Sequence, residues 1–185
     1  TNDNNVIISR VGPASLKMAN MIIKSNDEKL KNQLADLLNK WTKFEGFDKQ
    51  FLELCTCEKL EKGKVVMSMT VDEKYCNVLS NLHGGAIATL TDVISSIAIL
   101  TTNLDAIVPS VSVEISMVYS NPAPVDRKIF IVSSVYKSGR NLAFTETTIY
   151  LDSEDSGIVI AKGSHTKFIK KEEEILGDGS ISGNS

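Results

Sequence analysis

One acidic residue stands alone in the most apolar stretch of this sequence. Asp92 is the only formally charged side chain between Lys74 and Asp105. On a helical wheel it falls on a narrow polar face, away from the large aliphatic residues. Its neighbours on that face are Ala88, Thr89, Ser95 and Ser96. A carboxylate in such surroundings is costly unless it is hydrogen-bonded or used in proton transfer. The residues alone leave an ordinary Asp on a solvent-facing stripe equally open.

Two glycines mark the start of the same segment, in the run Leu82-His83-Gly84-Gly85. The first amides of a helix have no internal partner and lie at the positive end of its dipole. Glycine also lets a ligand approach the backbone closely. Such amides bind an oxygen that gains negative charge during acyl transfer. A tight turn without a ligand, with His83 as a structural histidine, explains the same residues.

The spacing of these two features predicts an oligomer. Gly84 and Asp92 are eight residues apart, which corresponds to roughly 12 Å along a helix axis. One reacting carbon cannot contact both within hydrogen-bonding distance. Either the helix begins after Gly84, or the site joins Gly84 of one subunit to Asp92 of another. We favour the second interpretation, which makes a homodimer the smallest active unit.

The helix that carries Asp92, at about 84–101, is predicted to lie among strands. Alternating apolar residues and turn residues such as Asn121-Pro122-Ala123-Pro124 delimit these strands. They are predicted at 51–59, 64–71 and about 108–120, 128–137, 141–152 and 157–169. In the third strand one face is predicted to carry Val111, Val113, Ile115, Met117 and Tyr119, and the other Ser110, Ser112, Glu114 and Ser116. Two strands, an apolar helix and four consecutive strands predict an α+β fold.

Residues 1–48 are predicted to form a helical extension of this domain. A first helix is expected at about 14–24, and Asn26-Asp27 is expected to cap a second one that runs to about Trp41. The apolar residues of the second helix follow helical spacing: Leu30, Leu34, Leu37 and Leu38. The main domain is predicted at 49–170, followed by a flexible tail at 171–185.

Composition excludes several classes of protein. The net charge of −3 argues against nucleic-acid binding. Three cysteines, Cys55, Cys57 and Cys76, are an odd number that argues against a disulfide framework, and we interpret them as free thiols and not as part of a metal site. The apolar stretch 86–100 is too short and too polar to span a bilayer. We expect a cytoplasmic protein. A mitochondrial one is the alternative, because residues 1–25 carry a single acid.

Several motifs resemble those of hotdog-fold acyl-CoA thioesterases. The Asn…His-Gly-Gly…Asp pattern of that family is present as Asn77, His83, Gly84, Gly85 and Asp92. The resemblance is closest to the PaaI-like branch that includes the animal thioesterase superfamily members, and it covers about residues 50–169. It continues through 109–113, 119–123, 137–139, 142–145 and 165–167. It implies a hotdog fold, in which an antiparallel sheet of about six strands wraps a long central helix.

The resemblance also implies a catalytic role for five residues. Asp92 stands where the family has its general base or nucleophile, and Ser112 where a serine helps to position the attacking water. The Gly84 amide and the Asn77 side chain stand where the family polarises the thioester carbonyl. His83 matches a histidine near the sulfur leaving group.

Substrate contacts are implied at Gly85, Glu114, Tyr119 and Lys137. Tyr119 and Lys137 match positions that contact the CoA part of the ligand. Glu114 replaces the Asp of close relatives, and Phe168 replaces a His of some relatives, so this resemblance supports no nucleotide contact at Phe168.

An acyl-CoA substrate, of medium or long chain, follows from the resemblance, together with a dimer or a dimer of dimers. No metal and no further cofactor is implied. The sequence lacks the Gly-x-Ser-x-Gly motif of serine hydrolases, and we interpret His165 as structural. A non-catalytic acyl-CoA or acyl-carrier binding protein on the same fold stays an alternative, as does a scaffold that binds a protein through its N-terminal helices.

Overall fold

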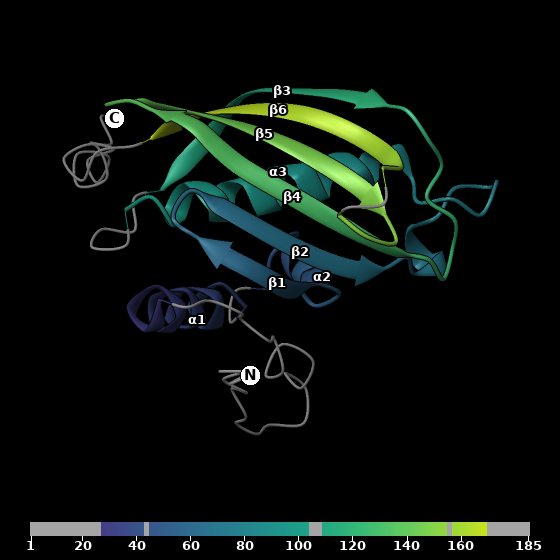
Figure 1. Ribbon diagram of the computed structural model, residues 1–185, viewed down its shortest axis with the longest axis horizontal. Coiled ribbons are helices and arrows are strands. Elements are labelled where there is room, and N and C mark those ends of the chain that lie inside the picture. Colours follow the sequence, from purple (N-terminus) through teal and green to yellow (C-terminus); the bar gives the residue numbers. More distant parts are fainter. Residues whose placement is uncertain (1–26, 43–44, 104–108, 155–156, 170–185) are drawn as a thin grey trace, which may run out of the picture.

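A six-stranded antiparallel sheet curves around one long helix in the computed structural model (Figure 1). The structure describes residues 27–42, 45–103, 109–154 and 157–169. The strand order in the sheet is β1-β2-β4-β5-β6-β3, so β1 and β3 are the two edges. The elements are α1 (Glu28–Thr42), α2 (Lys49–Leu52), β1 (Thr56–Glu61), β2 (Lys64–Thr70), η2 (Glu73–Tyr75), α3 (Gly84–Leu100), β3 (Ser110–Tyr119), β4 (Lys128–Ser138), β5 (Leu142–Leu151) and β6 (Val159–Ile169). The predicted α+β fold with a central helix is confirmed.

The central helix α3 is buried on most of its surface because the sheet covers it from β2 to β6. Its aliphatic side chains form the middle of the core: Ile87, Leu90, Val93, Ile94 and Ile97. Gly163 of β6 lies close to this helix, since a Cβ added there would come within 3.0 Å of the Thr91 methyl group. The strand that faces the polar side of α3 therefore approaches it closely.

The helix α1 begins and packs as the sequence predicts. The Asp27 carboxylate accepts a hydrogen bond from the Leu30 amide at 3.0 Å, which caps the first turn. Its four predicted leucines are buried in the same apolar cluster as α3, and the helix contacts α2 and β1. The predicted helix at 14–24 and the predicted tail at 171–185 lie outside the described residues.

The predicted strand at 51–59 is wrong in its first half. Residues 49–52 form the short helix α2, and β1 begins only at Thr56. Phe51 and Leu52 are both buried, and an extended strand would have turned these adjacent side chains to opposite faces. The helical turn instead directs both into the core, where the Phe51 ring lies 5.1 Å from that of Tyr75.

The predicted single apolar face of β3 is also wrong, because a β-bulge interrupts the strand. The pairing with β6 shifts between Ser112 and Glu114, and an extra residue reverses the alternation of side chains. Ser112 pairs with Lys167 and Ile115 pairs with His165, and both of these β6 residues point toward α3. Val111 lies on the other face. It is exposed, as are Val113 and Val118.

The three cysteines are free thiols, as predicted. Cys55 and Cys57 are buried, and burial raises the pKa of each to about 12. These two thiols therefore stay protonated and unreactive at neutral pH. Among the described residues, no helix is both long enough and apolar enough to cross a membrane.

Replacing a leucine of α1 tests whether this helix belongs to the folded core. Leu34 is fully buried, so Leu34→Ala should lower the free energy of unfolding by about 2–5 kcal/mol. The exposed Asp36 on the same helix gives a matched control, since Asp36→Ala should change it by no more than about 0.5 kcal/mol. Urea denaturation measures both values. Equal stability of the two variants would show that α1 is not part of the cooperative unit.

Candidate functional site

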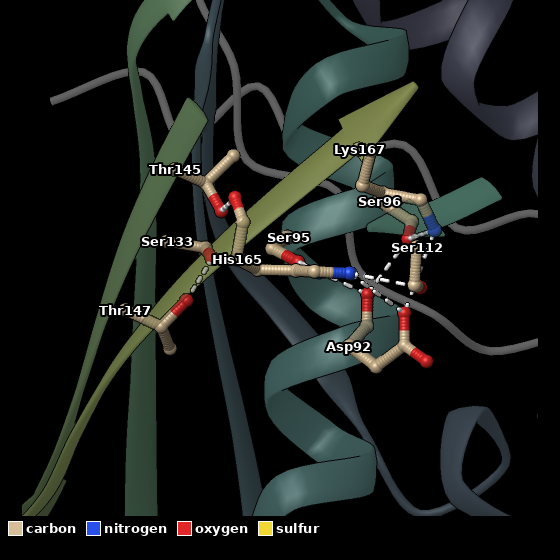
Figure 2. A network of polar contacts seen from close by, with 9 residues as sticks. All are labelled: Asp92, Ser95, Ser96, Ser112, Ser133, Thr145, Thr147, His165 and Lys167. Atoms are coloured by element: carbon tan, nitrogen blue, oxygen red, sulfur yellow. Dashed lines mark hydrogen bonds and ion pairs between the residues drawn. The ribbon is translucent and has the colours of Figure 1, made fainter. Parts of the chain in front are cut away.

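The polar face of α3 meets β6 and β3 in one cluster of side chains (Figure 2). Asp92, Ser95 and Ser96 share a helix face because residues three and four apart are neighbours. His165 and Lys167 share a strand face because they are two apart. Ser112 joins them from β3, directly opposite Lys167. Local periodicity and strand pairing thus bring six polar residues of three elements to one place.

The Asp92 carboxylate is held through one of its two oxygens. The Lys167 ammonium lies 3.5 Å from Oδ1, and His165 Nε2 lies 3.7 Å from the same atom. The side chain is 45% exposed, and Oδ2 points away from these partners in Figure 2. One oxygen is therefore anchored in the cluster and the other is available to a water or a ligand.

His165 is fixed from both sides of its ring. Ser95 Oγ lies 2.7 Å from Nδ1 and Ser112 Oγ lies 2.9 Å from Nε2. The Thr145 hydroxyl donates to the His165 carbonyl at 3.0 Å. Burial lowers the pKa of His165 to about 4. The Asp92 charge opposes this shift, and the Lys167 charge adds to it. The imidazole is therefore neutral at pH 7, and one of the two serines donates to it while the other accepts.

The start of α3 forms a second cluster, around the two glycines. His83 is the N-cap residue, and its Nδ1 accepts a hydrogen bond from the Gly85 amide at 2.9 Å. The Gly84 amide has no acceptor in the described part of the chain, so its N–H is free to bind a ligand oxygen. Tyr119, at the end of β3, donates its hydroxyl to the Gly84 carbonyl at 3.1 Å.

Asn77 lies in the loop that leads to α3. Its side-chain oxygen accepts hydrogen bonds from the amides of Leu79 and Asn81, at 2.9 and 3.3 Å. This use of the oxygen leaves the Nδ2 amide group as the donor that Asn77 can offer to a ligand.

Two of the predicted substrate contacts lie on the other face of the sheet. Glu114 pairs with Thr166, and Lys137 pairs with Phe144. Both partners alternate with residues that point toward α3, so Glu114 and Lys137 point away from it. A single protomer therefore does not bring them together with Asp92.

The observed bounds of α3 show whether Gly84 and Asp92 lie on the same helix. α3 begins at Gly84, so Gly84 and Asp92 lie on the same continuous helix, roughly 12 Å apart along its axis. The alternative of a helix that begins later is thereby excluded, and the two halves of the predicted site are separate within one protomer.

Comparison with known proteins shows the family to which this chain belongs. A model of the thioesterase superfamily matches residues 79–158, which include Asp92 and Ser112. Human acyl-coenzyme A thioesterase 13 is 38% identical over 136 residues, which cover 74% of this chain and 94% of the human protein. This chain belongs to the thioesterase superfamily.

Solved structures of two other proteins agree with the fold. Thioesterase superfamily member 2 from zebra fish matches with a TM-score of 0.67 and 34% identity, over 75% of this chain and 97% of that chain. The E. coli PaaI protein, at 15% identity, shares the fold with a TM-score of 0.64, over 80% of this chain and 97% of its own. The predicted membership of the thioesterase family is confirmed, and so is the predicted PaaI-like hotdog fold.

Two residues of the candidate site in this thioesterase are not evident from local sequence patterns. The sequence predicts a structural role for His165, and the structure places it in contact with both Ser112 and Asp92. Lys167 had no assigned role, yet it is an ion-pair partner of Asp92. The signal available in the sequence was their spacing, which places both side chains on one face of a strand.

The neutral state of His165 can be measured directly. Its imidazole should take up a proton only near pH 4, whereas a histidine in the unfolded chain does so near pH 6.5. Between these values the unfolded state binds more protons, so the free energy of unfolding should fall as the pH is lowered through this window. An NMR titration of the histidine nitrogens, with His165→Gln to assign the signal, gives the value. Titration near pH 6.5 would contradict the burial argument.

Proposed function

We propose that this protein hydrolyses the thioester bond of acyl-CoA, giving a free acid and CoA. The observation that carries the proposal is the Asp92 carboxylate, the one charged group on a mostly apolar helix, with one oxygen anchored and the other available. The identity of 38% to human acyl-coenzyme A thioesterase 13 supports the same activity. The substrates we propose are medium- to long-chain fatty acyl-CoAs.

In the proposed mechanism Asp92 acts as a general base on water. The free carboxylate oxygen accepts a proton while the water oxygen attacks the thioester carbonyl carbon. The resulting tetrahedral intermediate collapses with loss of the CoA sulfur, which takes up a proton and leaves as the thiol. We assign to Ser112 the role of orienting the attacking water, and its hydrogen bond to His165 at 2.9 Å supports this role. Asp92 can equally be written as the nucleophile, with a mixed anhydride that water then hydrolyses.

The carbonyl oxygen needs hydrogen-bond donors as its charge grows. We assign this role to the Gly84 amide and to the Asn77 Nδ2 group of a second subunit, since α3 separates Gly84 from the Asp92 of its own chain. His83, at the same helix start, would lie near the leaving sulfur. Gly85 and Tyr119 border this region, and we assign Lys137 and Glu114 to the CoA portion on the partner's side.

The exposed edge strand β3 supports a homodimer. It is ten residues long, pairs with β6 alone among the strands of the described residues, and exposes three valines. A long apolar edge is a hazard unless another chain covers it. We propose that a second copy does so, which would bring the start of one α3 to the Asp92 of the other chain.

Replacing the proposed base tests the catalytic assignment. Asp92→Asn keeps the shape of the side chain but removes the proton acceptor, so kcat for decanoyl-CoA should fall by about 10²- to 10⁴-fold. Thiol release measured with a chromogenic disulfide gives the rate. Asp36→Asn, an exposed change on α1, is the control and should keep the wild-type rate. A folded Asp92→Asn variant with full activity would contradict the assignment of Asp92 as the base. If the wild-type protein binds decanoyl-CoA without releasing thiol, the alternative of a non-catalytic acyl-CoA binding protein is favoured.

Mixed dimers test whether the site is shared between subunits. Asn77→Ala and Asp92→Asn should each be nearly inactive alone. In a heterodimer of the two chains, one of the two sites combines the intact Asn77 of one subunit with the intact Asp92 of the other. Random mixing by refolding should therefore restore about a quarter of the wild-type activity, since half of the dimers are mixed and each has one good site. A mixture as inactive as its components would place the whole site within one chain.

A further inference from the structure

A buried ammonium group, that of Lys167, lies beside the half-exposed carboxylate of Asp92. The Lys167 side chain is only 8% exposed. Its Nζ donates to Ser96 Oγ at 2.7 Å and lies 3.5 Å from Asp92 Oδ1. Ser96 Oγ in turn donates to the Asp92 carbonyl at 2.7 Å. Lys167 is thus tied to both the side chain and the backbone of the same aspartate.

Stability alone is a poor explanation for a lysine at this position. Burying an ammonium group costs several kcal/mol of solvation, which can exceed what an ion pair with a half-exposed carboxylate returns. An apolar side chain of similar length would fill the space between β6 and α3 without that cost. The inward-facing residue across β5 is in fact apolar, since Ala143 pairs with Lys167. The positive charge of Lys167 is therefore better explained by the groups that it contacts.

The contacts of Lys167 single out one carboxylate oxygen. Both Lys167 and His165 approach Oδ1, and His165 is neutral at pH 7 because burial lowers its pKa to about 4. Of the two basic side chains that contact Asp92 in the described ranges, Lys167 is therefore the one that supplies positive charge. A charged donor on Oδ1 fixes the rotation of the carboxylate group and directs Oδ2 outward.

We infer that Lys167 is a positioning residue for acyl-CoA hydrolysis, holding Asp92 by Oδ1 so that Oδ2 faces the attacking water. The inference rests on the proposed function, in which Asp92 is the base. Lys167 need not touch the substrate, because it acts through the orientation of Asp92. Its removal should therefore reduce kcat and leave the binding of acyl-CoA almost unchanged.

Kinetics of charge-removing and charge-keeping variants test the inference. With decanoyl-CoA, Lys167→Met should lower kcat by about 100-fold, since misplacing a reacting group by about 1 Å has an effect of this size, while KM should change by less than about threefold. Lys167→Arg keeps a positive charge at this position, so its kcat should be at least about tenfold higher than that of Lys167→Met. Lys162→Met is the matched control, because Lys162 is exposed on the same strand, and it should behave as wild type. A Lys167→Met variant within threefold of the wild-type kcat, or a Lys167→Arg variant no faster than Lys167→Met, would overturn the inference.

A second variant covers the case in which Lys167→Met does not fold. Ser96→Ala removes the hydroxyl that anchors Lys167 and keeps the charge, so kcat should fall by roughly tenfold with KM unchanged. An unchanged kcat in folded Ser96→Ala would count against the inference.

A double-mutant cycle separates failure of this inference from failure of the proposed function. The urea midpoints of wild type, Asp92→Asn, Lys167→Met and the double variant report the coupling between the two side chains without any assay of activity. Non-additive midpoints support the ion pair, and additive midpoints overturn it. If Asp92→Asn is inactive while Lys167→Met is fully active, only the positioning role fails. If Asp92→Asn is fully active, the proposed function fails, whatever the cycle shows.

Discussion

The contact between Asp92 Oδ1 and the buried Lys167 ammonium is the constraint on which the site depends. It crosses from the central helix to β6 over 3.5 Å, so it requires these two elements to lie at a fixed distance and register. The neutral ring of His165 occupies the space beside it and links the carboxylate to Ser112. A change in helix position or strand register would separate all of these groups together.

The fold meets this requirement with small residues and one irregularity. Gly163 lets β6 approach α3, since a side chain there would crowd Thr91 and Met117. The bulge in β3 reverses the alternation after Ser112, so that Ser112, Ile115, Met117 and Tyr119 all face the helix. Without the bulge, the strand would present either its serine or its later apolar residues to α3, but not both. The packed core and the polar cluster are therefore compatible within a single strand.

Much of this arrangement was predictable from the sequence, and the remainder depends on contacts between distant segments. Asp92 is evident because no other charge lies near it in the chain, and α3 and β2 are evident from local patterns. The bulge in β3 is not evident from the sequence, because it is defined by pairing with a strand some fifty residues later. The same holds for the role of Lys167, whose partners Ser96 and Asp92 lie 71 and 75 residues earlier. The helix α2 was missed because four residues carry too little periodicity to tell a turn of helix from a strand.

A structure with a bound substrate analogue is the most direct test of the central claim. The analogue would be an acyl-CoA in which a methylene group replaces the thioester sulfur, so that the carbonyl is kept and hydrolysis is blocked. The account predicts that the carbonyl oxygen accepts a hydrogen bond from the Gly84 amide of one subunit. It also predicts that the carbonyl carbon faces Oδ2 of Asp92 in the other subunit, with Lys167 still on Oδ1. A carbonyl remote from Asp92, or an Asp92 whose Oδ2 is turned toward Lys167, would contradict it.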